Sequence, residues 1–186
     1  FNVNMPFSLF GLRSGAGLLV AADKYGFSND IDISLSYSYL FQLGTGTLGA
    51  GFSAGVLNKT ISPEWYIPSG PGHTPPEGDP LIPENDESFV APDFSAGVYY
   101  QGLSYYAGIS VTHLNQPKIK YSETATYVSR EYYLTAGYYY QLPNPAFELI
   151  PSVFIVHDGA TTQYLATGMV RYNKKIWGGV SYRISD

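Results

Sequence analysis

The sequence predicts an all-β fold, an antiparallel up-and-down transmembrane β-barrel to which this stretch contributes about ten strands. Three observations support it. Apolar residues recur with period two along most of the chain. Charged residues make up only 13% of the chain, against about 25% in typical soluble domains. Mean hydropathy is −0.07, and no run of about 18 uncharged apolar residues exists, which excludes transmembrane helices.

The strand pattern is clearest in 31–39. There Ile31, Ile33 and Leu35 alternate with Asp32 and Ser34, and a pleated strand sends these two sets to opposite faces. We expect the bulky set to face lipid and the small or polar set to face inward. The predicted strands are 1–9, 15–24, 31–39, 48–56, 94–100, 105–112, 132–140, 147–156, 163–172 and 176–184.

The connections between these strands alternate in length. Short turns marked by Gly, Pro or Asn are expected near 10–14, 44–46, 101–103, 143–145 and 173–175. Longer connections are expected at 25–30, 58–92 and 113–129, with one short member near 158–161. In an outer-membrane barrel the short turns lie at the periplasmic rim and the longer loops at the extracellular rim.

Composition also limits the function. The net charge is −5 without a Lys/Arg cluster, which argues against nucleic acid and anionic lipid head groups as partners. Cysteine is absent, so disulfides, thiolate metal sites and Cys nucleophiles are excluded. The 18 tyrosines suit the aromatic girdles of a membrane barrel. Because the chain begins at Phe1 without a signal peptide, we expect a mature or truncated piece.

The proline-rich connection 58–92 is the main candidate for partner binding. It holds eight of the 13 prolines, including Pro75 and Pro76, so regular structure is not expected there. A rim loop of this kind either binds a partner or forms a solvated cover. The proposed apolar anchor is Trp65, Tyr66 and Ile67, and the proposed acidic contacts are Glu77, Asp79, Glu84, Asp86 and Glu87.

Other candidate sites are weak. Calcium at Asp79, Asn85, Asp86 and Glu87 is conceivable, but the EF-hand spacing is missing. The three histidines, His73, His113 and His157, lack the spacing of zinc ligands. No G-x-S-x-G motif is present, so we expect no enzyme, no metal and no cofactor. Glu148, Arg171 and Arg183 are expected to face the lumen or to pair across strands.

Several segments resemble the PorP/SprF family of type IX secretion proteins. Residues 21–26, AADKYG, are similar to the family's "NDKIG" strand end, and 92–100 followed by 105–110 resembles its "PxFGxGxYY…YYxGLS" hairpin. The most specific block is 130–137, 148–152 and 172–183, which is similar to "RHYFLTAGY…KPS…YNDKxWLGxSYR". The resemblance covers essentially the whole chain in the family's order.

The resemblance implies an outer-membrane β-barrel of the type IX secretion and gliding machinery of Bacteroidota-type bacteria. Its implied partners are periplasmic ring components and secreted adhesins or other cargo, and it implies no catalytic residues. Because family members carry further strands, we expect residues 1–186 to form one domain that is part of a larger barrel. Two alternatives remain open, a passive porin-like channel and a soluble β-sandwich adhesin.

Overall fold

The computed structural model describes residues 1–62, 86–121 and 124–185, and its regular elements there are all β-strands. The strands are β1 (Asn2–Leu9), β2 (Leu12–Tyr25), β3 (Ser28–Leu43), β4 (Gly46–Ile61), β5 (Glu87–Gln101), β6 (Tyr105–Thr112), β7 (Lys118–Tyr121), β8 (Thr124–Tyr127), β9 (Glu131–Tyr138), β10 (Tyr140–Gln141), β11 (Phe147–His157), β12 (Thr162–Tyr172) and β13 (Ile176–Ser185). Within these ranges, no helix is long and apolar enough to cross a membrane.

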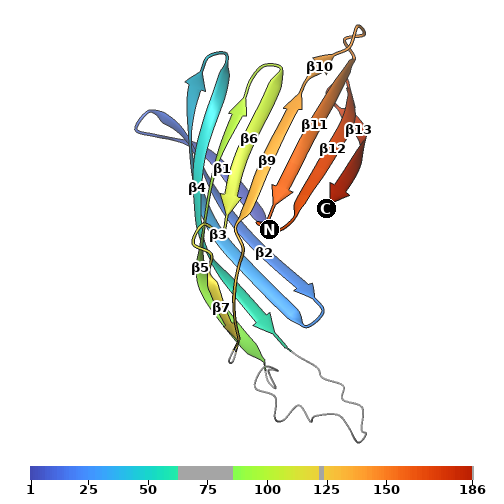
Figure 1. The fold of residues 1–186 in the computed structure, drawn as a ribbon. Helices are drawn as coiled ribbons and strands as arrows, with labels where there is room; N and C mark the ends of the chain where they lie inside the picture. Colours follow the sequence, from blue (N-terminus) through green and yellow to red (C-terminus); the bar gives the residue numbers. More distant parts are fainter. Residues whose placement is uncertain (63–85, 122–123, 186) are drawn as a thin grey trace, which may run out of the picture.

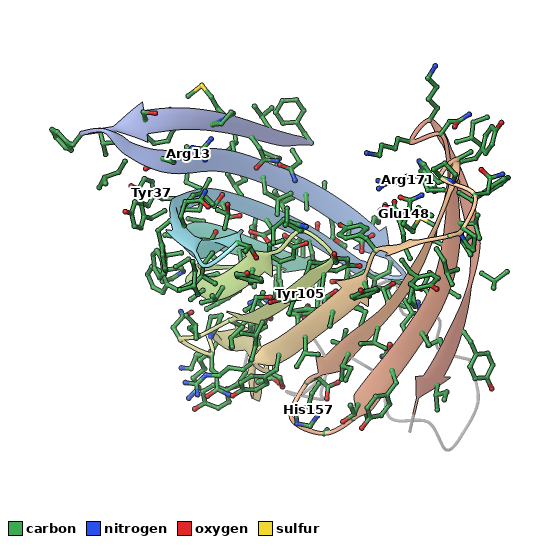
Figure 2. All side chains as sticks on the ribbon, turned by 90° about the horizontal axis from the view of Figure 1, so that it is seen from above. Arg13, Tyr37, Tyr105, Glu148, His157 and Arg171 are labelled. Carbon is green, nitrogen blue, oxygen red and sulfur yellow. The ribbon has the colours of Figure 1, made fainter. Side chains whose placement is uncertain are left out.

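The strands form an antiparallel up-and-down sheet, as predicted (Figure 1). Pairing runs β1-β2-β3-β4-β5-β6-β9-β11-β12-β13, with β10 beside β11. Each long strand therefore pairs with the next long strand along the chain, and the short strand β10 and the small hairpin β7-β8 lie outside this path. Seen from above, the sheet is strongly curved, with β1 and β2 at one end of the arc and β13 at the other (Figure 2).

The strand register confirms the predicted period-two pattern. Tyr37 lies opposite Phe52, Phe52 opposite Ala96, Ala96 opposite Val111, and Val111 opposite Tyr132. Because directly opposed residues share a face, the bulky sets of the seven predicted strands with clear alternation (1–9, 31–39, 48–56, 94–100, 105–112, 132–140 and 176–184) lie on one continuous face of the sheet, which we call the apolar face. Its side chains are exposed: Leu35 is 65% exposed and Val180 is 80% exposed.

The sheet has one layer. Among the described residues, the buried hydrophobic side chains are only Leu57, Ala91, Ile119 and Ile150. A β-sandwich would instead bury one face of each sheet against the other. The soluble sandwich that the sequence left open therefore does not fit this structure, and a sheet whose bulky face meets hydrocarbon does.

Three predicted connections were wrong in detail. Residues 25–30 form a two-residue turn at Gly26 and Phe27, where Gly26 has φ +54°. The connection 58–92 is shorter, because β4 continues to Ile61 and β5 begins at Glu87. Pro92 fits within β5 because its carbonyl accepts from the Asn115 side chain and not from β4, so the missing N–H falls on the strand edge that β4 does not use.

The third difference is in 113–129, predicted as a loop without strands. It contains the hairpin β7-β8, in which Ile119 pairs with Thr126. The predicted strand 132–140 is divided at Tyr139 into β9 and β10, although the register beside β11 continues across the break and the Tyr139 N–H donates to the Ser104 carbonyl, next to the end of β6. The short turns still lie at one rim, as predicted. The turns at 10–11, 44–45, 102–104 and 173–175 share one end of the sheet, here called the short-turn rim.

If the apolar face contacts lipid, the same substitution should affect stability very differently at neighbouring residues of β3. Leu35 lies on the apolar face and Ser36 on the opposite one. We expect Leu35→Arg to lower the free energy of unfolding by about 2–4 kcal/mol, as for a cation at the bilayer midplane, and Ser36→Arg to change it far less. Denaturant titration in lipid vesicles measures both, and equal losses would contradict lipid contact.

The turn between β11 and β12 predicts an acid-dependent stability. The backbone N–H of Thr161, the backbone N–H of Ala160 and the Thr161 hydroxyl donate to the Asp158 carboxylate, and these bonds lower its pKa from 3.8 to about 2. A lowered pKa stabilises the fold above the unfolded value, and this stabilisation is lost as pH falls through the folded value. The Tm difference between the native chain and Asp158→Asn should therefore narrow between about pH 4 and about pH 2. A Tm difference that stays the same across this pH range would refute the role of the Asp158 carboxylate.

Candidate functional site

The concave face of the sheet carries its charges. Apart from Lys24 at the end of β2, every charged residue of the ten long strands lies on the face opposite the apolar one. These residues are Arg13, Asp23, Asp30, Asp32, Lys59, Glu87, Asp93, Glu131, Glu148, Arg171 and Arg183. Figure 2 shows Glu148 and Arg171 on the inner side of the arc and Tyr37 and His157 on its outer side. A polar interior and an apolar exterior are the two sides of a membrane barrel wall.

One cross-strand ion pair lies toward the rim of the longer connections. Asp30 and Lys59 are register partners on β3 and β4, and Lys59 Nζ lies 2.6 Å from Asp30 Oδ2. The Ser28 and Tyr25 hydroxyls also donate to the Asp30 carboxylate, at 2.8 and 3.2 Å. The carboxylate therefore keeps several donors although it is mostly shielded from solvent.

A second polar pair fixes the start of the 113–130 connection. His113 Nδ1 lies 2.9 Å from Asp93 Oδ1, and Asp93 is only 8% exposed. Directly after it, the Leu114 N–H donates to the Phe94 carbonyl at 2.9 Å, and the Asn115 side chain donates to the Pro92 carbonyl at 2.7 Å. The connection is thus held along the part of β5 that extends beyond β6.

The hairpin β7-β8 then lies against β5. Ile119 of β7 is 4% exposed, and Leu57 and Ala91, which oppose each other on the concave face, are 7% and 4% exposed. We interpret this shared burial as docking of the hairpin on the concave face near the rim of the longer connections. A hairpin that lies on the concave face at this level narrows the space on that side of the sheet.

The opposite end of the concave face carries the pair Glu148 and Arg171. They are register partners on β11 and β12 and form an ion pair. Trp177 on β13 is the next partner in the same row, and the Arg171 guanidinium lies 5.8 Å from the centre of the Tyr139 ring. Arg183 shares this face opposite Leu165, so the three charges chosen from the sequence lie on one face but only two of them are brought together.

The candidate residues of the proline-rich connection are mostly beyond the described part of the chain. Trp65, Tyr66, Ile67, Glu77, Asp79 and Glu84 all fall within 63–85. Asp86 is exposed just before β5, and Glu87 is the first residue of β5, opposite Ile61. In the ranges 1–62, 86–121 and 124–185, no group of three or more His, Asp or Glu side chains could hold a metal ion.

Sequence reasoning missed two features of the concave face. The pair Asp93 and His113 was not identified, because the residues are twenty positions apart and only the folded-back connection joins them. The row of Tyr99, Tyr106 and Tyr139 was also missed. A signal for it existed, since each of these tyrosines falls on the side of its strand that otherwise carries Ser, Gly and Thr.

A family model places the chain among known proteins. The family model described as type IX secretion system membrane protein PorP/SprF matches residues 1–186. A search of curated proteins finds no significant match.

Docking of the hairpin β7-β8 can be tested by proteolysis. We expect Ile119→Asp to release the hairpin, because a buried carboxylate without a partner costs about 2 kcal/mol or more. Trypsin cleavage after Lys118 and Lys120 should then accelerate on the order of tenfold or more. Thr126→Asp is the matched control, since Thr126 is exposed in the same hairpin and should leave the rate unchanged. Equal rates in all three proteins would rule out docking.

Proposed function

Because the chain belongs to the PorP/SprF family of type IX secretion system membrane proteins, we propose that its rims bind secreted adhesins or other cargo and periplasmic ring partners of that machinery. It is an outer-membrane protein, and the family assignment is consistent with gliding motility and with Bacteroidota. A component of a secretion machine works through contacts with the other proteins of that machine. In this proposal, cargo binds the longer connections and the periplasmic ring partners bind the short turns.

The orientation of the apolar side chains supports this role. The bulky face of the sheet contacts lipid, so the rims and the concave face remain available for recognition of partners. At the short-turn rim, Phe10 and Leu103 are 94% and 81% exposed at the tips of two turns. Exposed apolar side chains on a rim offer anchoring points for a protein partner. Trp65, Tyr66 and Ile67 of the proline-rich connection remain the proposed anchor for cargo.

We also propose that the protein acts without catalysis, metal or cofactor. Four charged residues of the concave face form two ion pairs, Asp30 with Lys59 and Glu148 with Arg171. A catalytic centre would instead hold a nucleophile, a base and an orienting group within mutual reach. The motifs for such a centre are missing from the sequence.

A passive channel is the second candidate function. The observation that favours it is the concentration of charged residues on the concave face, which also suits a water-filled pore. A planar-bilayer recording of the purified protein separates the two functions. Selective, long-lived open pores without any bound protein would favour the channel.

Photo-crosslinking in native membranes tests the proposed partners. A benzophenone amino acid at Leu103 probes the short-turn rim, and one at Tyr66 probes the proline-rich connection. We expect protein adducts to ring components at Leu103 and to secreted cargo at Tyr66. The same amino acid at Leu35, on the apolar face, should give no protein adduct. Adducts only to general porins or to lipopolysaccharide at both rims would overturn the secretion role.

A further inference from the structure

A continuous row of aromatic rings crosses the concave face toward the short-turn rim. The rings of Tyr99 and Tyr106 are stacked with centroids 6.0 Å apart, and the rings of Tyr106 and Tyr139 follow at 5.7 Å. The Arg171 guanidinium continues the row 5.8 Å from the Tyr139 ring. These residues come from β5, from β6, from the segment after β9 and from β12, so the row exists only in the folded sheet.

Glycines on the neighbouring strands let these rings lie flat. A Cβ at Gly108 would lie 2.7 Å from the Tyr99 ring, and a Cβ at Gly137 would overlap the Tyr106 ring. The rings of Tyr99 and Tyr106 therefore each cover bare backbone of the next strand. Tyr99 remains 42% exposed, which leaves ring surface available to a ligand.

A cavity of about 500 Å³ lies beside the row, within the range of ligand-binding pockets. Ile150, which is 6% exposed, and Met169 contribute its apolar lining, and Trp177 stands at its side with 70% exposure. Apart from Arg171, the lining carries no charge. Apolar walls with a few polar groups characterise binding sites for organic ligands.

Arg171 supplies a donor that the protein does not use. One of its terminal nitrogens pairs with Glu148, but its Nε is buried and has no hydrogen-bond partner among the described residues. A buried atom is closed to a ligand, so the donor offered to the cavity is the accessible part of the guanidinium: the Arg171 side chain is 31% exposed and lines the cavity. Because Glu148 already balances the guanidinium charge, the site gives little advantage to an anion over a neutral acceptor.

We propose that this Tyr/Arg site binds an extended, uncharged segment of polypeptide. Tyrosine, tryptophan and arginine in a concave site are the composition of protein-recognition hot spots. Alternate side chains of an extended chain are about 6.6 Å apart, close to the ring spacings of 6.0 and 5.7 Å. A backbone carbonyl would accept from the exposed part of the Arg171 guanidinium. This inference rests on the proposed secretion function and names a binding site within it.

Trp177 provides a direct readout in the purified full chain. Trp65→Phe leaves Trp177 as the single tryptophan. The probe is a capped, unstructured polypeptide of Gly, Ser, Asn and Tyr, with maltoheptaose as a saccharide probe. We expect a saturable change of Trp177 emission with the polypeptide and none with the saccharide. A response to the saccharide alone, or no response to the polypeptide, would overturn the proposal.

Matched variants locate the response. Tyr139→Leu should weaken polypeptide binding on the order of tenfold or more, whereas Tyr138→Leu, on the apolar face, should not. The double variant Glu148→Gln with Arg171→Gln removes the donor without leaving a buried charge and should also weaken binding, and Arg183→Gln should not. Equal effects of Tyr138→Leu and Tyr139→Leu would refute the site. If the rim crosslinks persist but the polypeptide does not change Trp177 emission, the secretion function stands and only this binding site is refuted.

Discussion

Backbone hydrogen bonding in the absence of water is the constraint on which this structure depends. In hydrocarbon each N–H and C=O needs a partner within the protein, and antiparallel pairing supplies one for every strand that has neighbours on both sides. Pairing fixes a pleat, and the pleat sends successive residues to opposite faces. Bulky apolar side chains, small side chains and charges are therefore sorted by position parity along the chain.

This separation of side chains between the two faces explains why the sheet has a defined shape although few side chains of the described residues are buried. A one-layer sheet cannot bury its bulky face within itself, so lipid takes the place of a second layer. The charges collect on the concave side, where neighbouring strands bring Asp30 to Lys59 and Glu148 to Arg171. Strand register makes the members of each pair direct neighbours, so the arrangement of these charges on the concave face is a consequence of strand pairing.

Sequence reasoning succeeded where local pattern carries the information. All ten long strands were predicted, and the inner and outer faces were predicted for the seven with clear alternation, because alternation depends only on neighbouring residues. It failed where a long-range contact decides. The hairpin β7-β8 has little apolar content of its own and is placed through Asp93, His113 and β5. Strand ends were also misjudged, since Pro92 is tolerated only because its N–H side faces away from β4.

The sequence by itself determined the strand period, the membrane-facing side and the positions of the short turns at one rim, because each depends on residues close together along the chain. Only the tertiary structure decided which distant residues meet. The row of Tyr99, Tyr106 and Tyr139 with Arg171 depends on register between four segments and on glycines that leave room for flat rings. Register is a property of paired strands, so no single segment could reveal it.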